Sequence, residues 1–247
     1  MSEIMRMWVE IIFNVAYLIV VWGLVILMTV RRDQVAAPDR MIARRIRQSF
    51  ALLALGDTGH VGFRVIAYAL GSLEAKPVVL GMPVSLVGLG ALSTAVTVTF
   101  FYMLLVDIWR RRFGKPMSFF AWSLIAAGVI RLVVMAFPQN QWELIVAPYG
   151  WSLLRNALLT YQGLGIMALI LRDAAANRDA AFRWVGWMIA VSFSFYAPVI
   201  LFAAQVPLLG MLMIPKTCAY VAIAVIAYRA LYRPQPAGMH NPQPVQP

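Results

Sequence analysis

The sequence has few charged residues for its length. Only 13% of its 247 residues are Asp, Glu, Lys or Arg, whereas 62% are hydrophobic. Soluble domains carry about 25% charged residues, so this composition excludes an ordinary soluble domain. Apolar runs of about 20 residues recur along the chain, and a helix of that length crosses a bilayer core. The composition therefore predicts an all-α integral membrane protein.

Cysteine and histidine are also scarce. The single cysteine, Cys218, excludes an internal disulfide and any metal site that needs several cysteines. The two histidines, His60 and His240, are far apart in the sequence, and neither has a second histidine nearby. The sequence also has no nucleophile motif, phosphate-binding loop or haem-ligating histidine pair. We therefore expect no metal site and no cofactor.

A removable signal peptide is not expected, because the first apolar run is too long and lacks a small-residue cleavage site. It is predicted to remain as the first of seven transmembrane helices in a single domain, residues 1–233. The Pro-rich segment 234–247 is predicted to be a disordered cytoplasmic tail. The seven predicted helices are 8–30, 50–73, 83–108, 117–137, 149–171, 184–205 and 208–230.

Acidic residues are outnumbered, with 10 Asp and Glu against 21 Lys and Arg. Most Lys and Arg residues lie in three loops, 31–47, 110–116 and 172–183. In the loops at the opposite ends of the helices, the one Lys or Arg residue is Lys76. This asymmetry orients membrane proteins and does not indicate nucleic-acid binding. It predicts an extracytoplasmic N-terminus and a cytoplasmic C-terminus in the cell membrane. Within the first loop, 41–50 could form a short amphipathic helix at the headgroups or a solvated segment.

Aromatic residues gather near the predicted outer ends of the helices. Trp8, Trp142, Tyr149 and Trp151 occupy such positions. Trp and Tyr are enriched at membrane interfaces, so we expect these rings to anchor the helices there.

Several ionisable residues lie well inside the predicted spans. A charge near the bilayer centre costs a few kcal/mol, so such residues usually face the bundle interior and mark function. Four of these residues are cations, namely Arg64, Arg131, Arg155 and Lys216. With a rise of about 1.5 Å per residue, they lie about 20–25 Å from the arginine-rich helix ends. They would thus share one layer in the outer half of the membrane. The residues are Asp57, His60, Arg64, Arg131, Arg155 and Lys216.

Both faces of the second predicted span are expected to contact protein and not lipid. Asp57, His60 and Arg64 follow one another at i, i+3 and i+7, which places them on one side of a helix. Small residues on the other side allow close packing against a neighbouring helix. These residues are Gly56, Gly59 and Gly62.

Asp57 is the single clearly intramembrane carboxylate, so the cations need further compensation. One alternative is a structural network in which Glu10, Glu74 and Glu143 reach the arginines. The other is an anionic small molecule or lipid headgroup, and Lys216 would then hold the anion or pair with Asp57. We predict a ligand-binding site formed by Asp57, His60, Arg64, Arg131, Arg155, Asn156, Tyr196 and Lys216.

Lys216 also raises the question of a chromophore. A buried lysine in the seventh helix, with SFSFYAP (192–198) in the sixth, resembles microbial rhodopsins, which bind retinal as a Schiff base. The chain departs from that pattern because the third span has only hydroxyl residues at this depth. Leu212, one turn before Lys216, also replaces an acid.

Three functions follow as hypotheses. The leading one is a transporter or receptor that binds an anionic ligand. The second is a membrane enzyme acting on a lipid-soluble substrate with Asp57 and His60 as acid and base. The third is a retinal photoreceptor through Lys216. Membrane lipids are expected partners, nucleic acid is not, and assembly into a homo-oligomer is left open.

Overall fold

A computed structural model describes residues 3–79, 81–144, 147–203 and 205–233. The predicted tail, 234–247, lies outside the described residues. Almost all of the described chain is helical. The α-helices are α1 (Glu3–Val30), α2 (Arg40–Ala69), α3 (Leu86–Arg112), α4 (Phe119–Met135), α5 (Tyr149–Ala176), α6 (Ala180–Phe202) and α7 (Met213–Leu231).

Short elements connect these helices. Four 3-10 helices are present, η1 (Arg32–Gln34), η2 (Ala37–Asp39), η3 (Pro138–Asn140) and η4 (Pro207–Leu212). One antiparallel pair of two-residue strands joins β1 (Val78–Val79) to β2 (Met82–Pro83).

Six of the helices are long and apolar enough to cross a membrane. The prediction of an all-α, multi-pass membrane protein is confirmed at this level. The remaining helix, α4, is apolar but has only 17 residues. The count of seven spans and the direction in which the chain crosses the membrane therefore stay predictions.

The starts of α2 and of the last span differ from the sequence prediction. α2 begins at Arg40 and runs without a break, so residues 41–50 form no separate helix at the headgroups. Ile42, Ile46 and Phe50 are buried at helical spacing, which explains why the first turns of α2 continue into the bundle. The last span begins as η4 and becomes α-helical only at α7. Pro215 then falls in the first turn of α7, where its missing N–H costs no helical hydrogen bond.

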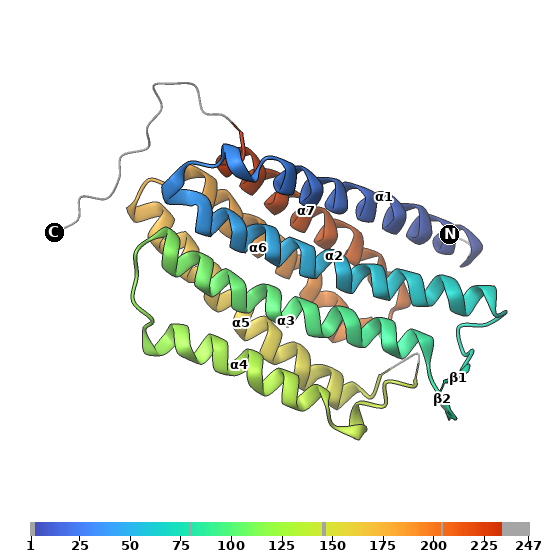
Figure 1. The fold of residues 1–247 in the computed structure, drawn as a ribbon. Coiled ribbons are helices and arrows are strands. Elements are labelled where there is room, and N and C mark those ends of the chain that lie inside the picture. The colour runs from blue at the N-terminus through green and yellow to red at the C-terminus, as the bar shows by residue number, and fades with distance from the viewer. Residues whose placement is uncertain (1–2, 80, 145–146, 204, 234–247) are drawn as a thin grey trace.

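The helices lie alongside one another in an elongated bundle (Figure 1). The N-terminus and the β1–β2 pair lie at one end, which we call the N-terminal end. The loops 31–39, 113–118 and 177–179 lie at the other, which we call the arginine-rich end. α2 packs most extensively on α3, and α1 contacts α2 and α7.

Glycines bring α2 and α3 close together. A Cβ atom on Gly56 would overlap the Thr97 side chain, and one on Gly59 would lie 2.6 Å from Ser93 Oγ. The predicted small-residue packing face is therefore confirmed at these two positions. It is wrong for Gly62, where an added Cβ would meet nothing within 4 Å.

Aromatic side chains fill the interior between the middle of the bundle and the arginine-rich end. Phe101 makes edge contacts with Phe50, Tyr102 and Tyr220, with ring centroids 5.3–5.6 Å apart. Beyond this cluster, buried Trp109 donates its indole N–H to Asp173 Oδ2 at 2.8 Å. The helix interior is packed along this stretch, and the larger of the two cavities described below lies in the other half.

Candidate functional site

A cavity of about 500 Å³ lies in the N-terminal half of the bundle. All seven α-helices and η4 contribute to its walls. Its lining includes all eight residues that the sequence selected as a ligand site, and whether they bind a ligand stays a prediction. They are Asp57, His60, Arg64, Arg131, Arg155, Asn156, Tyr196 and Lys216.

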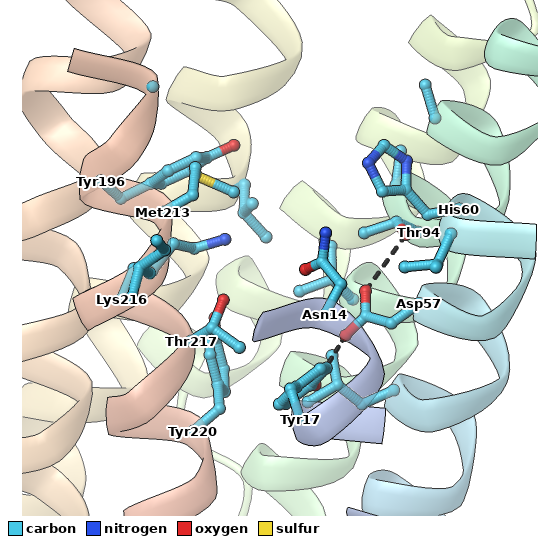
Figure 2. Close-up of a pocket in the computed structure, with 18 of the residues that line it drawn as sticks. Asn14, Tyr17, Asp57, His60, Thr94, Tyr196, Met213, Lys216, Thr217 and Tyr220 are labelled. Carbon is cyan, nitrogen blue, oxygen red and sulfur yellow. Dashed lines mark hydrogen bonds between the residues drawn. The ribbon is translucent and has the colours of Figure 1, made fainter. Parts of the chain in front are cut away.

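Asp57 is held by its neighbours on two other helices. Tyr17 of α1 donates its hydroxyl to Asp57 Oδ2 at 2.6 Å (Figure 2). Thr94 of α3 shares its hydroxyl proton between Asp57 Oδ1 at 3.2 Å and the carbonyl of Gly56 at 3.1 Å. Both carboxylate oxygens therefore accept a hydrogen bond from a neutral donor. The carboxylate is fixed in position without a cationic partner in contact.

Lys216 lies on the opposite wall and points toward Asp57 across the cavity (Figure 2). Its Nζ lies 4.3 Å from the centroid of the Tyr196 ring and 5.6 Å from that of Tyr220. These aromatic faces attract the ammonium group. Within the described chain, Lys216 forms no ion pair, so the expected pairing with Asp57 is not made.

Arg131 of α4 is bound to the backbone of its neighbours. Its Nε donates to the carbonyl of Arg155 at 2.8 Å and its Nη1 to that of Ala95 at 2.6 Å. Nη1 also donates to the Thr99 hydroxyl. The residue is only 2% exposed, and no carboxylate contacts it within the part of the chain that the structure describes. Arg131 thus joins α4 to α3 and α5 while its charge remains uncompensated by an acid.

Arg155 of α5 has neutral partners as well. Its Nη1 donates to Asn140 Oδ1 at 2.9 Å, and its guanidinium carbon lies 4.4 Å from the centroid of the Trp142 ring. Trp142 donates its indole N–H to the carbonyl of Met135 at 3.0 Å and lines the cavity. The expected role of Trp142 as an interface anchor stays a prediction, and the structure adds a contact of its ring with Arg155 beside the cavity.

Asn156 and Tyr196 form a further pair on the wall that carries Lys216. Tyr196 donates its hydroxyl to Asn156 Oδ1 at 3.0 Å, which ties α6 to α5. The same tyrosine ring contacts the Lys216 ammonium. The pair thus positions the aromatic face that Lys216 covers.

Arg64 and His60 complete the stripe on α2 and have fewer partners. No hydrogen bond or ion pair among residues 3–79, 81–144, 147–203 and 205–233 engages Arg64. His60 Nδ1 is buried and lacks a hydrogen-bond partner there. No hydrogen bond joins His60 to Asp57 in the same ranges, so the two groups do not form a proton relay as they stand.

The predicted structural network of acids is not formed by the glutamates that can be placed. Glu74 and Glu143 are exposed, and neither makes an ion pair with a described residue. The side chain of Glu10 lies outside the described residues. Among the described residues, the cavity therefore combines four formal positive charges with one carboxylate, that of Asp57.

The sequence did not single out several polar residues of this cavity. Tyr17, Thr94 and Trp142 contact its charged groups, yet none was among the eight selected residues. Asn14 also lines the cavity. Tyr17 lies three residues after Asn14, so both share a face of α1. That spacing of two polar residues in an apolar helix was the available signal.

The site has no metal centre within the described residues, since they contain no group of three His, Cys, Asp or Glu side chains that could hold an ion. Its chemistry is that of cations, hydroxyl groups and aromatic rings around one carboxylate. Comparisons of this chain with protein-family models, curated proteins and solved structures find no match.

Proposed function

We propose that this membrane protein binds an anionic small molecule or lipid headgroup in the cavity, as a receptor or transporter. The observation that carries the proposal is the charge of the lining. Four cations face one space in which Asp57 is the one acid that the described part of the chain contributes, and they are Arg64, Arg131, Arg155 and Lys216. Unpaired charges are costly in a low-dielectric interior, so an anion in this space would be stabilised by the excess of cations.

The cations divide into two kinds. Arg131 and Arg155 are fixed by carbonyl, amide and hydroxyl oxygens, so they supply a preorganised positive field. Arg64 and Lys216 have no hydrogen-bond acceptor among the described residues. These two side chains retain donors for a carboxylate or phosphate group, which is the contact that specifies an anion.

The cavity also has apolar walls, which bear on the rest of the ligand. Phe13, Val61, Leu159 and Ile214 line it alongside the charged groups. Its volume of about 500 Å³ is in the range of small-molecule sites. An amphiphile with one acidic group fits this combination better than a small inorganic anion does.

The arginine-rich loops support a cell-membrane protein with those loops in the cytoplasm. The N-terminal end and the cavity would then lie toward the extracytoplasmic side. A ligand would reach the cavity from that side or from the outer leaflet, because aromatic residues fill the interior toward the other end.

The proposal is tested by comparing decanoate with decanol, which has the same chain but no charge. Thermal unfolding of the purified protein in nanodiscs is measured with each compound. Decanoate is expected to raise the melting temperature more than decanol, and Lys216→Met and Arg64→Gln should each reduce that difference. Arg183→Gln, at an exposed site at the arginine-rich end, is the control. Equal effects of the two compounds on the wild type would refute binding of the acidic group.

A further inference from the structure

A second cavity, of about 240 Å³, lies at the arginine-rich end. It is separate from the proposed ligand site because the aromatic cluster around Phe101 lies between them. We call it the arginine groove. Its charged and polar lining consists of Arg32, Asp33, Arg40, Arg44, Arg47 and Tyr232.

Helical spacing explains why these arginines meet. Arg40, Arg44 and Arg47 follow one another at i, i+4 and i+7 in the first turns of α2, so they share one face. Tyr232, which follows α7, donates its hydroxyl to the carbonyl of Ala43 at 2.6 Å and thereby closes one side of the groove. Burial raises the pKa of Tyr232 to about 12, so this donor stays protonated at neutral pH.

Other arginines at the same end have carboxylate partners. Arg45, on a different face of α2, lies 3.0 Å from Asp107. Arg112 contacts Asp39 at 2.9 Å and Asp179 at 2.8 Å. These arginines are therefore neutralised by acids, and the ion pairs join neighbouring helix ends.

The arginine groove lacks this compensation. Asp33 is the one acid in its lining and lies 3.5 Å from Arg32. Arg40 donates to the carbonyl of Val35 at 3.4 Å. Arg44 and Arg47 have neither an ion pair nor a hydrogen bond in the described ranges. Two guanidinium groups with free donors thus face one concave site.

We infer that the arginine groove binds a phosphate group, either that of an anionic phospholipid or that of a soluble phosphate compound. Guanidinium groups bind phosphate oxygens through paired N–H donors. Residues next to the groove favour the lipid source. Val30 is 73% exposed and Met41 is 44% exposed, so apolar surface suited to acyl chains lies beside Arg32 and Arg40 in the sequence.

The test compares lipids that differ in charge. The full chain in detergent is titrated with phosphatidylglycerol, with phosphatidylcholine and, separately, with inorganic phosphate, and thermal unfolding is recorded. Phosphatidylglycerol is expected to raise the melting temperature by several degrees more than phosphatidylcholine. The double variant Arg44→Gln, Arg47→Gln should lose at least half of that difference, and Arg183→Gln should keep it.

Each remaining outcome has a defined meaning. Stabilisation by inorganic phosphate alone, lost in the same double variant, assigns the groove to soluble phosphate compounds. A double variant that responds to phosphatidylglycerol as the wild type does would overturn the inference. If the double variant does not fold, Arg44→Gln and Arg47→Gln are measured singly, and full responses in both would also overturn it. The double variant Arg44→Gln, Arg47→Gln should keep the wild-type decanoate response, because neither residue lines the first cavity, so failure here and failure of the proposed function are separable.

Discussion

The Tyr17 hydroxyl donates a hydrogen bond of 2.6 Å to Asp57 Oδ2. This contact joins α1 to α2 at the wall of the cavity and gives its single carboxylate a neutral donor. An acid that is held this way keeps its position when no cation touches it. Lys216 on the far wall is consequently free to meet another anion.

Tyr17→Phe should destabilise the protein, because Asp57 Oδ2 would lose its hydroxyl donor. A hydrogen bond to a charged group contributes about 1.5–3 kcal/mol, so we expect a loss of that size in the free energy of unfolding. Denaturant unfolding in mixed micelles measures it. Tyr149→Phe, at an exposed tyrosine, is the control and should change little. Equal effects of the two variants would show that the hydroxyl contact does not stabilise α1 on α2.

The contact between α2 and α3 gives a prediction with an internal control. Gly56→Ala should destabilise the bundle by about 1–3 kcal/mol, because the new methyl group would overlap the Thr97 side chain. Gly62→Ala, six residues along the same helix, has open space around the added atom. It should be neutral or stabilising by up to about 1 kcal/mol, since alanine favours helices. Thermal unfolding of both variants checks the pair, and a reversed order would contradict the packing.

Part of the cavity could be predicted because helical spacing alone determines it. Asp57, His60 and Arg64 share a face in any α-helix, and their cost in a membrane turns that face inward. The similar depths of Arg131 and Arg155 likewise follow from counting residues along each helix. Side-chain contacts across the bundle do not follow from such counting, so Arg131 could not be assigned to backbone carbonyls in advance.

The errors have physical causes as well. The arginines at the start of α2 suggested a loop, although Ile42 and Ile46 carry the helix into the bundle from the same turns. Trp142 was placed at the interface because it lies near a helix end. Its ring also contacts Arg155. Spacing along the sequence does not predict this contact between side chains of two different segments.

Arg131→Lys tests whether the guanidinium geometry matters or only its charge. A lysine keeps the charge but cannot reach the carbonyls of Ala95 and Arg155 in the same forked arrangement. We expect a loss of about 2 kcal/mol in unfolding free energy, since hydrogen bonds from charged donors contribute about 1.5–3 kcal/mol each and some re-form. Arg183→Lys, at an exposed site, should have no measurable effect. Wild-type stability of Arg131→Lys would show that charge alone suffices.

Asp179 has two roles that different substitutions separate. It accepts a hydrogen bond from the Phe182 N–H at 3.1 Å as the N-cap of α6, and it pairs with Arg112 at 2.8 Å. Asp179→Asn keeps the cap and loses the ion pair, whereas Asp179→Ala loses both. The alanine variant should be less stable than the asparagine variant by about 1 kcal/mol, the usual contribution of an N-cap. Denaturant midpoints decide this, and equal midpoints would show that the cap contributes nothing.

Asp57→Asn should strengthen binding of an anion in the cavity, which is the opposite of what loss of a site residue usually does. The asparagine amide oxygen can accept the Tyr17 hydrogen bond, and its NH2 group can donate to the Thr94 hydroxyl, which still donates to the carbonyl of Gly56 at 3.1 Å, so the wall is kept. The formal charge of the lining rises because a neutral amide replaces the carboxylate. The repulsion between residue 57 and a bound anion is therefore removed. At an effective dielectric constant of about 20 and a separation of about 8–16 Å, that repulsion is about 1–2 kcal/mol. This corresponds to a roughly 5- to 30-fold gain in decanoate affinity.

Calorimetric titration measures the affinity, with decanol as the neutral compound that should bind both proteins equally. Weaker decanoate binding by Asp57→Asn would mean that Asp57 contacts the ligand as a donor, and the cations would then not be what selects it.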